Sequence, residues 1–214
     1  MSATELDRLR AMDIYLIDQV LKGRLDDLGC VVDVGAGAGR NLPWFVGRAE
    51  RVVALDSRPE AFEAMDEGLS ELGLNATARA GVERVLGRIE DGPLEPGTAD
   101  LVICNAVLHF ASDPAQFEAM LRGAWALVAP GGMFFARLAS SVGIEGSLVP
   151  LGAGRFLLPD ESERFLVDGR GLEEWPDRLG AERLEPVKTT VVSGLRAMST
   201  WVLRAAGGQE SLSR

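Results

Sequence analysis

Between residues 30 and 138, short apolar runs typical of buried strands alternate with segments that carry a helical period. The expected strands are Cys30–Val34, Arg51–Leu55, Ala76–Arg79, Leu101–Asn105 and Met133–Leu138. The expected helices are Asn41–Arg48, Ala61–Leu72, Glu83–Ile89 and a segment from Pro114 to about Val128. Because parallel strands need a crossover, usually helical, this alternation predicts an α/β fold: a Rossmann-like, doubly wound sheet with helices on both faces.

The two ends of the chain extend this pattern. Residues 1–25 carry apolar residues at three-to-four spacing, which predicts one amphipathic opening helix. Leu184–Val192 and Leu195–Leu203 are rich in strand-forming residues and flank Ser193-Gly194, a two-residue hairpin signal. We therefore expect a mostly parallel seven-stranded sheet that ends in an antiparallel hairpin.

One domain is expected over residues 1–204, because a chain of 214 residues suffices for one continuous core. Residues 139–180 are rich in Gly, Ser and Arg and lack a clear period, apart from a short helix near Leu172–Leu179. They are expected to cover the substrate site. Residues 205–214 are small and polar and predict a flexible tail.

Composition narrows the choice of partners. The chain has 22 Lys and Arg against 32 Asp and Glu, a net charge of −10, which would repel a nucleic acid. It has neither an apolar run long enough to span a bilayer nor the pattern of a signal peptide, so a cytoplasmic protein with no membrane partner is expected. Cys30 and Cys104 fall in apolar runs and are expected to be core residues, not metal ligands.

A glycine-rich loop follows the first expected strand in the sequence CVVDVGAGAGRN. Gly35, Gly37 and Gly39 lack β-carbons and let the backbone approach a ligand closely, which predicts a nucleotide-like cofactor. A triphosphate-binding loop would continue with Lys and Ser or Thr, but this one continues with Arg40. A dinucleotide fingerprint would need glycine at Arg40 or at Leu42, depending on its start, so neither pattern fits.

The pattern that remains, Asp33 followed by three alternating glycines, resembles motif I of the class I S-adenosylmethionine-dependent methyltransferases. Asp56 lies 17 residues after Gly39, at the end of a strand, where a carboxylate can accept both hydroxyls of an adenosine ribose. The segments 99–110 and 127–133 resemble the family's fourth strand and the glycine turn before its fifth. These elements cover roughly residues 27–140.

Within that family, residues 35–41 and 196–204 resemble the tellurite-resistance and small-molecule branch. The resemblance implies S-adenosylmethionine as cofactor and S-adenosylhomocysteine as its product. Asp33, Gly35, Gly37 and Gly39 would then lie against the methionine part of the cofactor and Asn105 at its amino-acid end.

One position departs from the family pattern. An acidic residue often ends the third strand and faces the adenine, whereas this chain has Ala80-Gly81-Val82-Glu83 there. Adenine recognition is therefore expected from the backbone of Gly81 and Val82, with Glu83 as a further candidate.

Four other site residues each have two interpretations. Arg40 either meets the cofactor carboxylate or caps a helix in solvent. His109, the only histidine, lies one turn past the fourth strand and is either a general base for a hydroxyl or amine or a structural histidine. Tyr15 and Arg137 either face the methyl acceptor or serve packing.

These observations predict methyl transfer to a small molecule or oxyanion. Besides Arg137, the arginines that can hold an anionic acceptor or pair with surface carboxylates are Arg155, Arg164, Arg170 and Arg196. Two alternatives remain at this point: a NAD-type oxidoreductase, and a protein that binds S-adenosylmethionine without catalysis.

Overall fold

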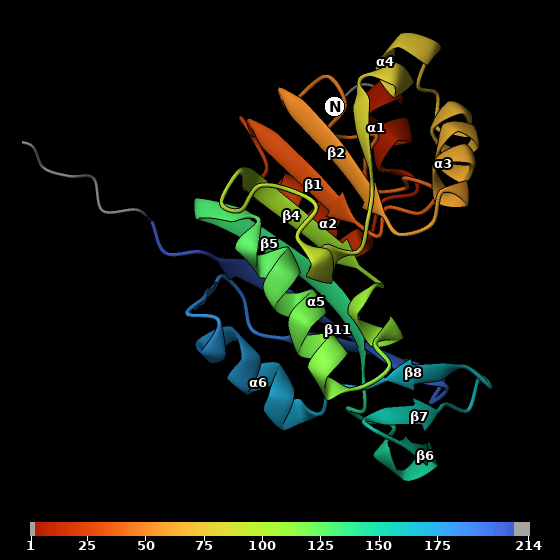
Figure 1. Cartoon of the computed structure of the whole chain (residues 1–214). Coiled ribbons are helices and arrows are strands. Elements are labelled where there is room, and N and C mark those ends of the chain that lie inside the picture. Colours follow the sequence, from red (N-terminus) through yellow and green to blue (C-terminus); the bar gives the residue numbers. More distant parts are fainter. Residues whose placement is uncertain (1–2, 208–214) are drawn as a thin grey trace, which may run out of the picture.

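The computed structural model describes residues 3–207, and its centre is one sheet with the strand order β10-β11-β5-β4-β1-β2-β3 (Figure 1). The strands are β1 Cys30–Val34, β2 Arg51–Asp56, β3 Val82–Leu86, β4 Ala99–Asn105, β5 Val128–Ser140, β10 Lys188–Val192 and β11 Arg196–Arg204. β1 to β5 run parallel, and β11 runs antiparallel between β5 and β10. The mostly parallel sheet with its terminal hairpin is thus confirmed, with a two-residue β9 (Glu182–Arg183) added beside β11.

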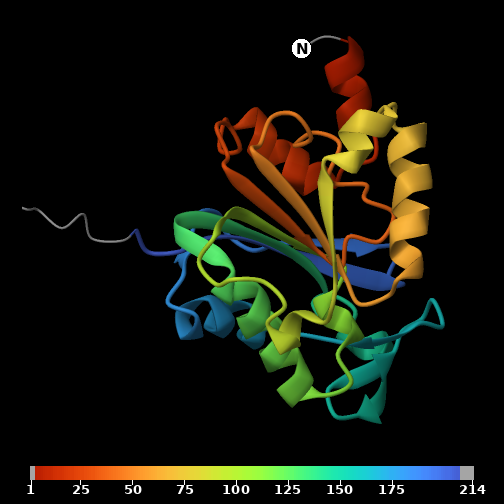
Figure 2. The ribbon, with the colours of Figure 1, turned by 45° about the horizontal axis from the view of Figure 1, so that its top comes forward.

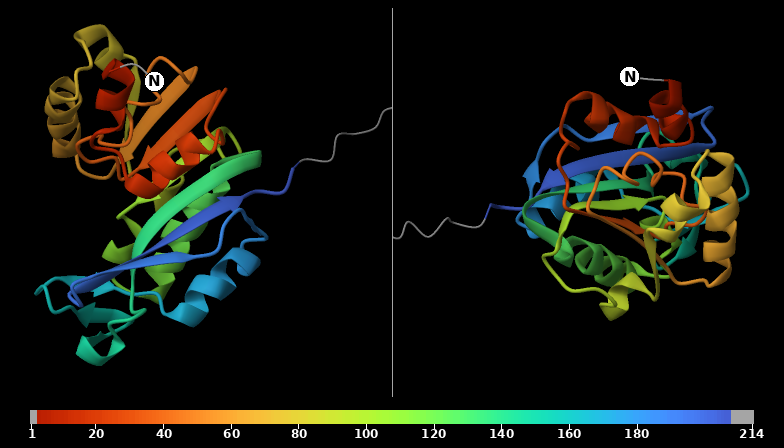
Figure 3. Two further views of the ribbon diagram at one scale, coloured as in Figure 1. Left: turned by 180° about the vertical axis from the view of Figure 1, so that it is seen from behind. Right: turned by 90° about the horizontal axis from the view of Figure 1, so that it is seen from above.

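Helices cover both faces of the sheet, as expected (Figure 3). The helices are α1 Ala3–Leu9, α2 Ile14–Leu21, α3 Glu60–Glu71, α4 Ala76–Ala80, α5 Pro114–Ala126 and α6 Gly169–Arg178. One core cluster joins α2 and α3 to strand residues such as Val31 and Ile103, and a second joins α5 and α6 to residues such as Val32 and Cys104. Successive strand residues point to opposite faces, so each strand feeds both cores. No helix within residues 3–207 is long and apolar enough to cross a bilayer.

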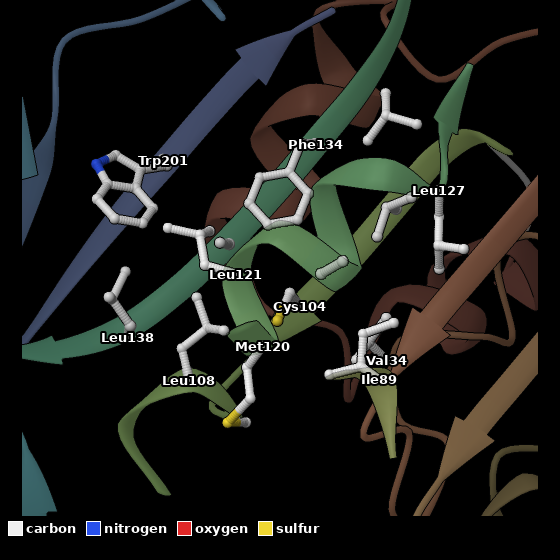
Figure 4. Close-up of a cluster of buried hydrophobic side chains, with 14 of the residues drawn as sticks. Val34, Ile89, Cys104, Leu108, Met120, Leu121, Leu127, Phe134, Leu138 and Trp201 are labelled. Atoms are coloured by element: carbon white, nitrogen blue, oxygen red, sulfur yellow. The ribbon is translucent and has the colours of Figure 1, made fainter. Parts of the chain in front are cut away.

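The core under α5 contains several of the largest buried side chains (Figure 4). Leu121 of α5 lies near Phe134 of β5 and Trp201 of β11, and all three are at most 1% exposed. The indole of Trp201 donates a hydrogen bond to the carbonyl of Leu172 in α6 at 2.9 Å, which fixes that helix on the sheet. Cys104 is also buried here, as is Cys30 at the start of β1, and burial raises the pKa of both thiols.

The expected elements between residues 76 and 89 are wrong. Residues 76–80 form α4 instead of a strand, because the Asn75 side chain accepts a hydrogen bond from the backbone N–H of Ala78 and caps the helix. The strand follows as β3, where a helix was expected, and pairs with β2 from Val82 opposite Val52 to Leu86 opposite Asp56. In such short segments the local propensity is overridden by pairing with β2.

The expected helix over residues 41–48 is also absent. These residues form successive turns, in which Leu42 and Phe45 are buried. Pro43 has no backbone donor and Gly47 adopts a φ of +80°, so neither favours a continued helix. The opening segment likewise contains two helices instead of one, because Asp13 caps the start of α2 by accepting from the backbone N–H of Tyr15 at 2.9 Å.

The segment expected to cover the substrate site contains a second, smaller sheet. Its antiparallel strands are β6 Val149–Gly152, β7 Arg155–Leu157 and β8 Glu163–Phe165. Figures 1 and 2 show this sheet at the opposite end of the molecule from α1 and α4. A helix was expected where α6 lies, whereas these short strands, which are exposed or half-buried except at Phe165, carry no clear alternation in the sequence.

The terminal hairpin turns at Ser193 and Gly194, which both have positive φ, the conformation that a tight hairpin turn requires. After β11, the predicted flexible tail begins with backbone hydrogen bonds from Ala205 to Gly132 and from Gly131 to Ala206. The rest of that predicted tail, residues 208–214, lies outside the described residues.

Candidate active site

Two neighbouring cavities lie at the carboxyl ends of the parallel strands. The first cavity, of about 450 Å³, is lined by residues that end or follow β1, β2, β3 and β4 and by the start of α5. The second cavity, of about 400 Å³, is lined by residues from β5, from the segment 139–180 (called the cover below) and from the β10–β11 hairpin. Ala106 and Phe110 line both cavities. Ligands of doubly wound sheets bind at this edge, so the two cavities form the candidate site.

The glycine loop passes beside the first cavity. Gly35, Gly37 and Gly39 have φ values of +65°, +52° and +72°. A β-carbon at Gly35 would lie 2.5 Å from Val107 Cγ2, and one at Gly39 would lie 2.7 Å from Met65 Cγ. Of the three glycines only Gly35 lines the first cavity. Two of the glycines are therefore required by the chain's own packing, in addition to any ligand.

Asp56 is fixed at the end of β2, in the wall of the first cavity. It is 4% exposed, and its Oδ2 accepts a hydrogen bond from the Gly37 N–H at 3.0 Å. Its Oδ1 accepts from the Arg58 backbone N–H, also at 3.0 Å, and from Arg58 Nε at 3.4 Å. A carboxylate has about four lone-pair sites, so capacity remains for a ribose hydroxyl. The position fits the role expected from the sequence.

The residues expected to contact the adenine do not line either cavity. Gly81 and Val82 lie at the amino end of β3, because the strand begins at Val82, and neither lines a cavity. Glu83 is likewise distant from the cavities and pairs with Arg51 at 2.8 Å. The residues that follow the carboxyl end of β3 and line the first cavity are Gly87, Arg88, Ile89 and Glu90.

Asp33 and Asn105 leave buried polar atoms without partners. Asp33 Oδ2 and both polar side-chain atoms of Asn105 accept or donate no hydrogen bond. Asn105 lines the second cavity, whereas Asp33 is 2% exposed and lines neither. Burial raises the pKa of Asp33 to about 7, partly opposed by the charge of Arg40 and reinforced by that of Asp56. Buried polar groups without partners are costly, so these atoms suit a polar ligand.

The second cavity is rich in arginine. Four arginines line it against one carboxylate, that of Asp160; they are Arg40, Arg137, Arg164 and Arg196. Arg137 donates to Asp13 at 2.7 Å, and Arg40 lies 3.9 Å from the same carboxylate. In a chain with a net charge of −10, this is a local reversal of sign.

His109 lies in the wall of the second cavity and is 6% exposed. Its Nδ1 accepts a hydrogen bond from the backbone N–H of Ala139 at 3.2 Å, so the neutral ring carries its proton on Nε2. Burial, and secondarily the charge of Arg164, lowers the pKa of His109 to about 4. This bond occupies the lone pair that a general base needs and disagrees with the expected base role.

Of the other two residues expected to face the methyl acceptor, only Arg137 lines the second cavity. The Tyr15 hydroxyl forms a hydrogen bond with Thr190 Oγ1 at 2.5 Å, and the Tyr15 ring lies 5.3 Å from the Arg137 guanidinium. Asp13, which holds Arg137, was missed in the sequence, although an aspartate directly before an apolar helical run is a capping signal.

A family model described as a methyltransferase domain matches residues 32–136, the segment that supplies β2 to β4, most of β1 and β5, and the wall of the first cavity. Residues 32–136 thus form a class I S-adenosylmethionine-dependent methyltransferase domain. S-adenosylmethionine is the cofactor of this family. In this methyltransferase chain the first cavity, with Asp56 in its wall and the unpaired atoms of Asn105 nearby, fits such a cofactor.

Relatives agree with this methyltransferase fold. A curated protein named protein-L-isoaspartate O-methyltransferase, from Methanococcus maripaludis, is 32% identical over 127 residues, which cover 58% of this chain and 57% of that protein. The chain thus spans little more than half the length of that relative. A S-adenosylmethionine-dependent methyltransferase structure from Methanosarcina mazei has a TM-score of 0.71 at 15% identity, covering 88% of this chain and 98% of that one.

A third similar structure contains ligands. It is 1,6-didemethyltoxoflavin-N1-methyltransferase from Burkholderia thailandensis with bound 1,6-didemethyltoxoflavin and S-adenosylhomocysteine. Its TM-score is 0.62 at 18% identity, and the match covers 95% of this chain and 79% of that one. At such identities the two structures establish the fold of the methyltransferase and leave its acceptor open.

Replacing Asp56 by Ala is expected to weaken S-adenosylhomocysteine binding by about tenfold or more, because hydrogen bonds to a charged group contribute about 1.5–3 kcal/mol. The Gly37 N–H also loses its acceptor. Isothermal titration calorimetry measures the affinity, and circular dichroism checks that the variant is folded. A folded variant with unchanged affinity would show that Asp56 does not contact the ribose.

Proposed function

We propose that this chain transfers the methyl group of S-adenosylmethionine to a small molecule, with the cofactor in the first cavity and the acceptor in the second. The observation that carries the proposal is the wall that the cavities share at Ala106 and Phe110. Ala106 directly follows β4, has a φ of +63°, and donates its N–H to the Arg137 carbonyl at 2.8 Å. Strained backbone of this kind is concentrated at functional sites.

The chain's residues would bind and orient the two reactants. The cofactor supplies a sulfonium whose methyl group is already activated, so an in-line approach and exclusion of water are the main requirements. We assign Asp56 to the ribose and residues 87–90 to the adenine. The amino-acid end of the cofactor would extend from the first cavity to the edge of the second, where Asn105 and Arg40 lie. We assign Asn105 and the buried Asp33 beside it to that end, and Arg40, whose charge acts on Asp33, to its carboxylate.

Several features support a small acceptor. A cavity of about 400 Å³ falls within the range of small-molecule sites. The cover contributes Leu158, Asp160, Ser162 and Arg164 to its wall. The net charge of −10 also disfavours a nucleic acid.

The cofactor choice is tested by calorimetry. S-adenosylhomocysteine is expected to bind with micromolar affinity, about −8 kcal/mol, and NADH much more weakly. Binding of NADH that equals or exceeds that of S-adenosylhomocysteine would favour an oxidoreductase.

The acceptor class is tested by methyl transfer from labelled S-adenosylmethionine to a panel of small metabolites and oxyanions, compared with tRNA, duplex DNA and cell-extract protein. We expect saturable turnover of a small molecule. Labelling of a macromolecule without small-molecule turnover would contradict the proposal, and cofactor binding without any transfer would indicate a non-catalytic protein.

A further inference from the structure

The second cavity contains few groups that can accept a proton. The titratable side chains that line it are Arg40, His109, Arg137, Asp160, Arg164 and Arg196. Guanidinium groups stay protonated at ordinary pH. Only His109 and Asp160 therefore remain as candidate bases for an acceptor that must lose a proton.

His109 is arranged as a hydrogen-bond donor. A neutral imidazole has one nitrogen lone pair, and in His109 this is the Nδ1 lone pair that accepts the Ala139 N–H at 3.2 Å. Nε2 therefore carries the hydrogen. Taking up a second proton would break the Ala139 bond and create a buried cation near Arg164, whose charge already lowers the pKa of the ring.

Asp160 is a weak base. Its Oδ1 accepts hydrogen bonds from the backbone N–H of Ser162 at 3.1 Å and from the Ser162 hydroxyl at 2.5 Å. The Ser162 hydroxyl is the main cause that lowers the pKa of Asp160, and Arg196 and Arg164 add to it. A carboxylate with a lowered pKa removes a proton from an alcohol or ammonium poorly.

The arginines at this cavity differ from others in the cover. Arg155 pairs with Glu163 at 2.8 Å and Arg170 pairs with Glu174. Within residues 3–207, by contrast, Arg164 and Arg196 form no salt bridge. Arg164 Nη1 donates a hydrogen bond to the Glu163 carbonyl at 2.7 Å, and its guanidinium lies 5.0 Å from the Phe110 ring centre. The two guanidinium groups thus retain donors for an anion.

We propose that the acceptor is a small carboxylic acid that is methylated on its carboxylate, with Arg164 and Arg196 binding the anion and His109 Nε2 donating a hydrogen bond to it. This inference rests on the proposed function. A lone pair of a carboxylate oxygen forms the new O–CH3 bond, while the bond between carbon and sulfur breaks and its electron pair passes to sulfur. The products are a methyl ester and S-adenosylhomocysteine, and no proton is released.

Methylation of a carboxylate needs no base, and no described side chain of the second cavity is arranged to act as one. It also favours turnover: the ester is uncharged, so it loses its ionic attraction to the arginines as soon as it forms. An alcohol or ammonium acceptor would release one proton per methyl group and would leave the two arginines without an anion.

Matched probes test the acid-binding step independently of turnover. The protein saturated with S-adenosylhomocysteine is titrated with benzoate and benzamide, and with succinate and succinamide. We expect at least one acid to bind about tenfold or more tighter than its amide, and Arg164→Gln or Arg196→Gln to remove most of that preference. Arg155→Gln, a paired arginine of the same cover, is the control and should keep it. Equal or absent binding of acids and amides would overturn the inference.

The role of His109 has a direct readout, because it is the only histidine in the chain. In protein without a histidine tag, nitrogen-15 NMR of the imidazole should show the Nε2–H tautomer between pH 5.5 and 8. An Nδ1–H tautomer, or protonation near pH 6.5, would overturn the inference. For any acceptor that is methylated, release of one proton per S-adenosylhomocysteine formed would also overturn the inference.

These outcomes are separable from failure of the proposed function. If S-adenosylhomocysteine does not bind, the methyltransferase proposal itself is wrong. If it binds and methyl groups pass to alcohols or amines only, the proposed function stands and the carboxylate inference falls.

Discussion

Gly39→Ala is expected to destabilise the folded protein by about 2–5 kcal/mol. A non-glycine residue at a φ of +72° costs about 1–2 kcal/mol, and forcing an extra methyl group into a filled core costs about 1–3 kcal/mol. The added β-carbon would lie 2.7 Å from Met65 Cγ and 3.2 Å from Leu69 Cδ2. Both side chains are fully buried in α3 and have little room to move.

Gly37→Ala is the matched control for this prediction. Its φ of +52° is equally unusual, but the nearest atom to an added β-carbon is the Gly35 carbonyl oxygen at 4.0 Å. Only the conformational cost of about 1–2 kcal/mol then applies. Thermal unfolding should place the Gly39 variant on the order of 10 °C below the parent and the Gly37 variant closer to it. Equal shifts would show that the contact with α3 does not require glycine.

Asp33→Asn is expected to change the pH dependence of stability and to weaken cofactor binding. The carboxyl has a pKa of about 7 in the folded protein against an ordinary value of 3.8, chiefly because it is buried. The folded state therefore holds this proton more tightly than the unfolded state, and its contribution to stability is lost as the pH rises from about 4 through 7. Three pKa units correspond to up to about 4 kcal/mol.

Urea unfolding at pH 5 and pH 8 measures this effect. The parent should lose more stability than Asp33→Asn over that interval, because the amide does not ionise. The same variant should bind S-adenosylmethionine about tenfold or more weakly at pH 8, since a cationic ligand near the ionised carboxylate loses its partner. Parallel pH profiles would show that Asp33 titrates normally. Unchanged cofactor affinity would place Asp33 outside the binding site.

Much of the fold could be predicted because long apolar runs and turn residues carry strong local signals. The buried strands β1, β4 and β5 and the hairpin at Ser193-Gly194 follow directly from such patterns. The segment from residue 76 to residue 89 could not be assigned correctly. In that segment the Asn75 cap makes residues 76–80 helical, and pairing with β2 makes residues 82–86 a strand. The local periodicity of a sequence does not show which strand a segment will pair with.

The site residues also divide into those that a local motif predicts and those that depend on contacts between distant parts of the chain. Asp56 and Gly35 lie in the wall of the first cavity, at the strand ends where their motifs predicted them, whereas Gly37 and Gly39 do not line it. The residues that follow β3 into that wall are 87–90 and not Gly81 and Val82, because β3 begins later than expected. The bond between His109 and Ala139 joins residues 30 apart, so no sequence pattern indicates which nitrogen of the ring is occupied. The salt bridge between Arg155 and Glu163, and the absence of one at Arg164 within the described residues, likewise depend on strand register.

Residues 141–166 of the cover leave and rejoin the central sheet at nearly one point. Ser140, at the end of β5, forms a bridge with Val167, so residues 141–166 are an excursion whose two ends lie side by side. The cost of closing such a loop grows only slowly with its length. Evolution or an engineer could therefore exchange this excursion for one of different size and charge, provided that Phe165 keeps its stacking on Phe117. Acceptor selectivity would change with it, while the glycine loop and Asp56 would keep their frame.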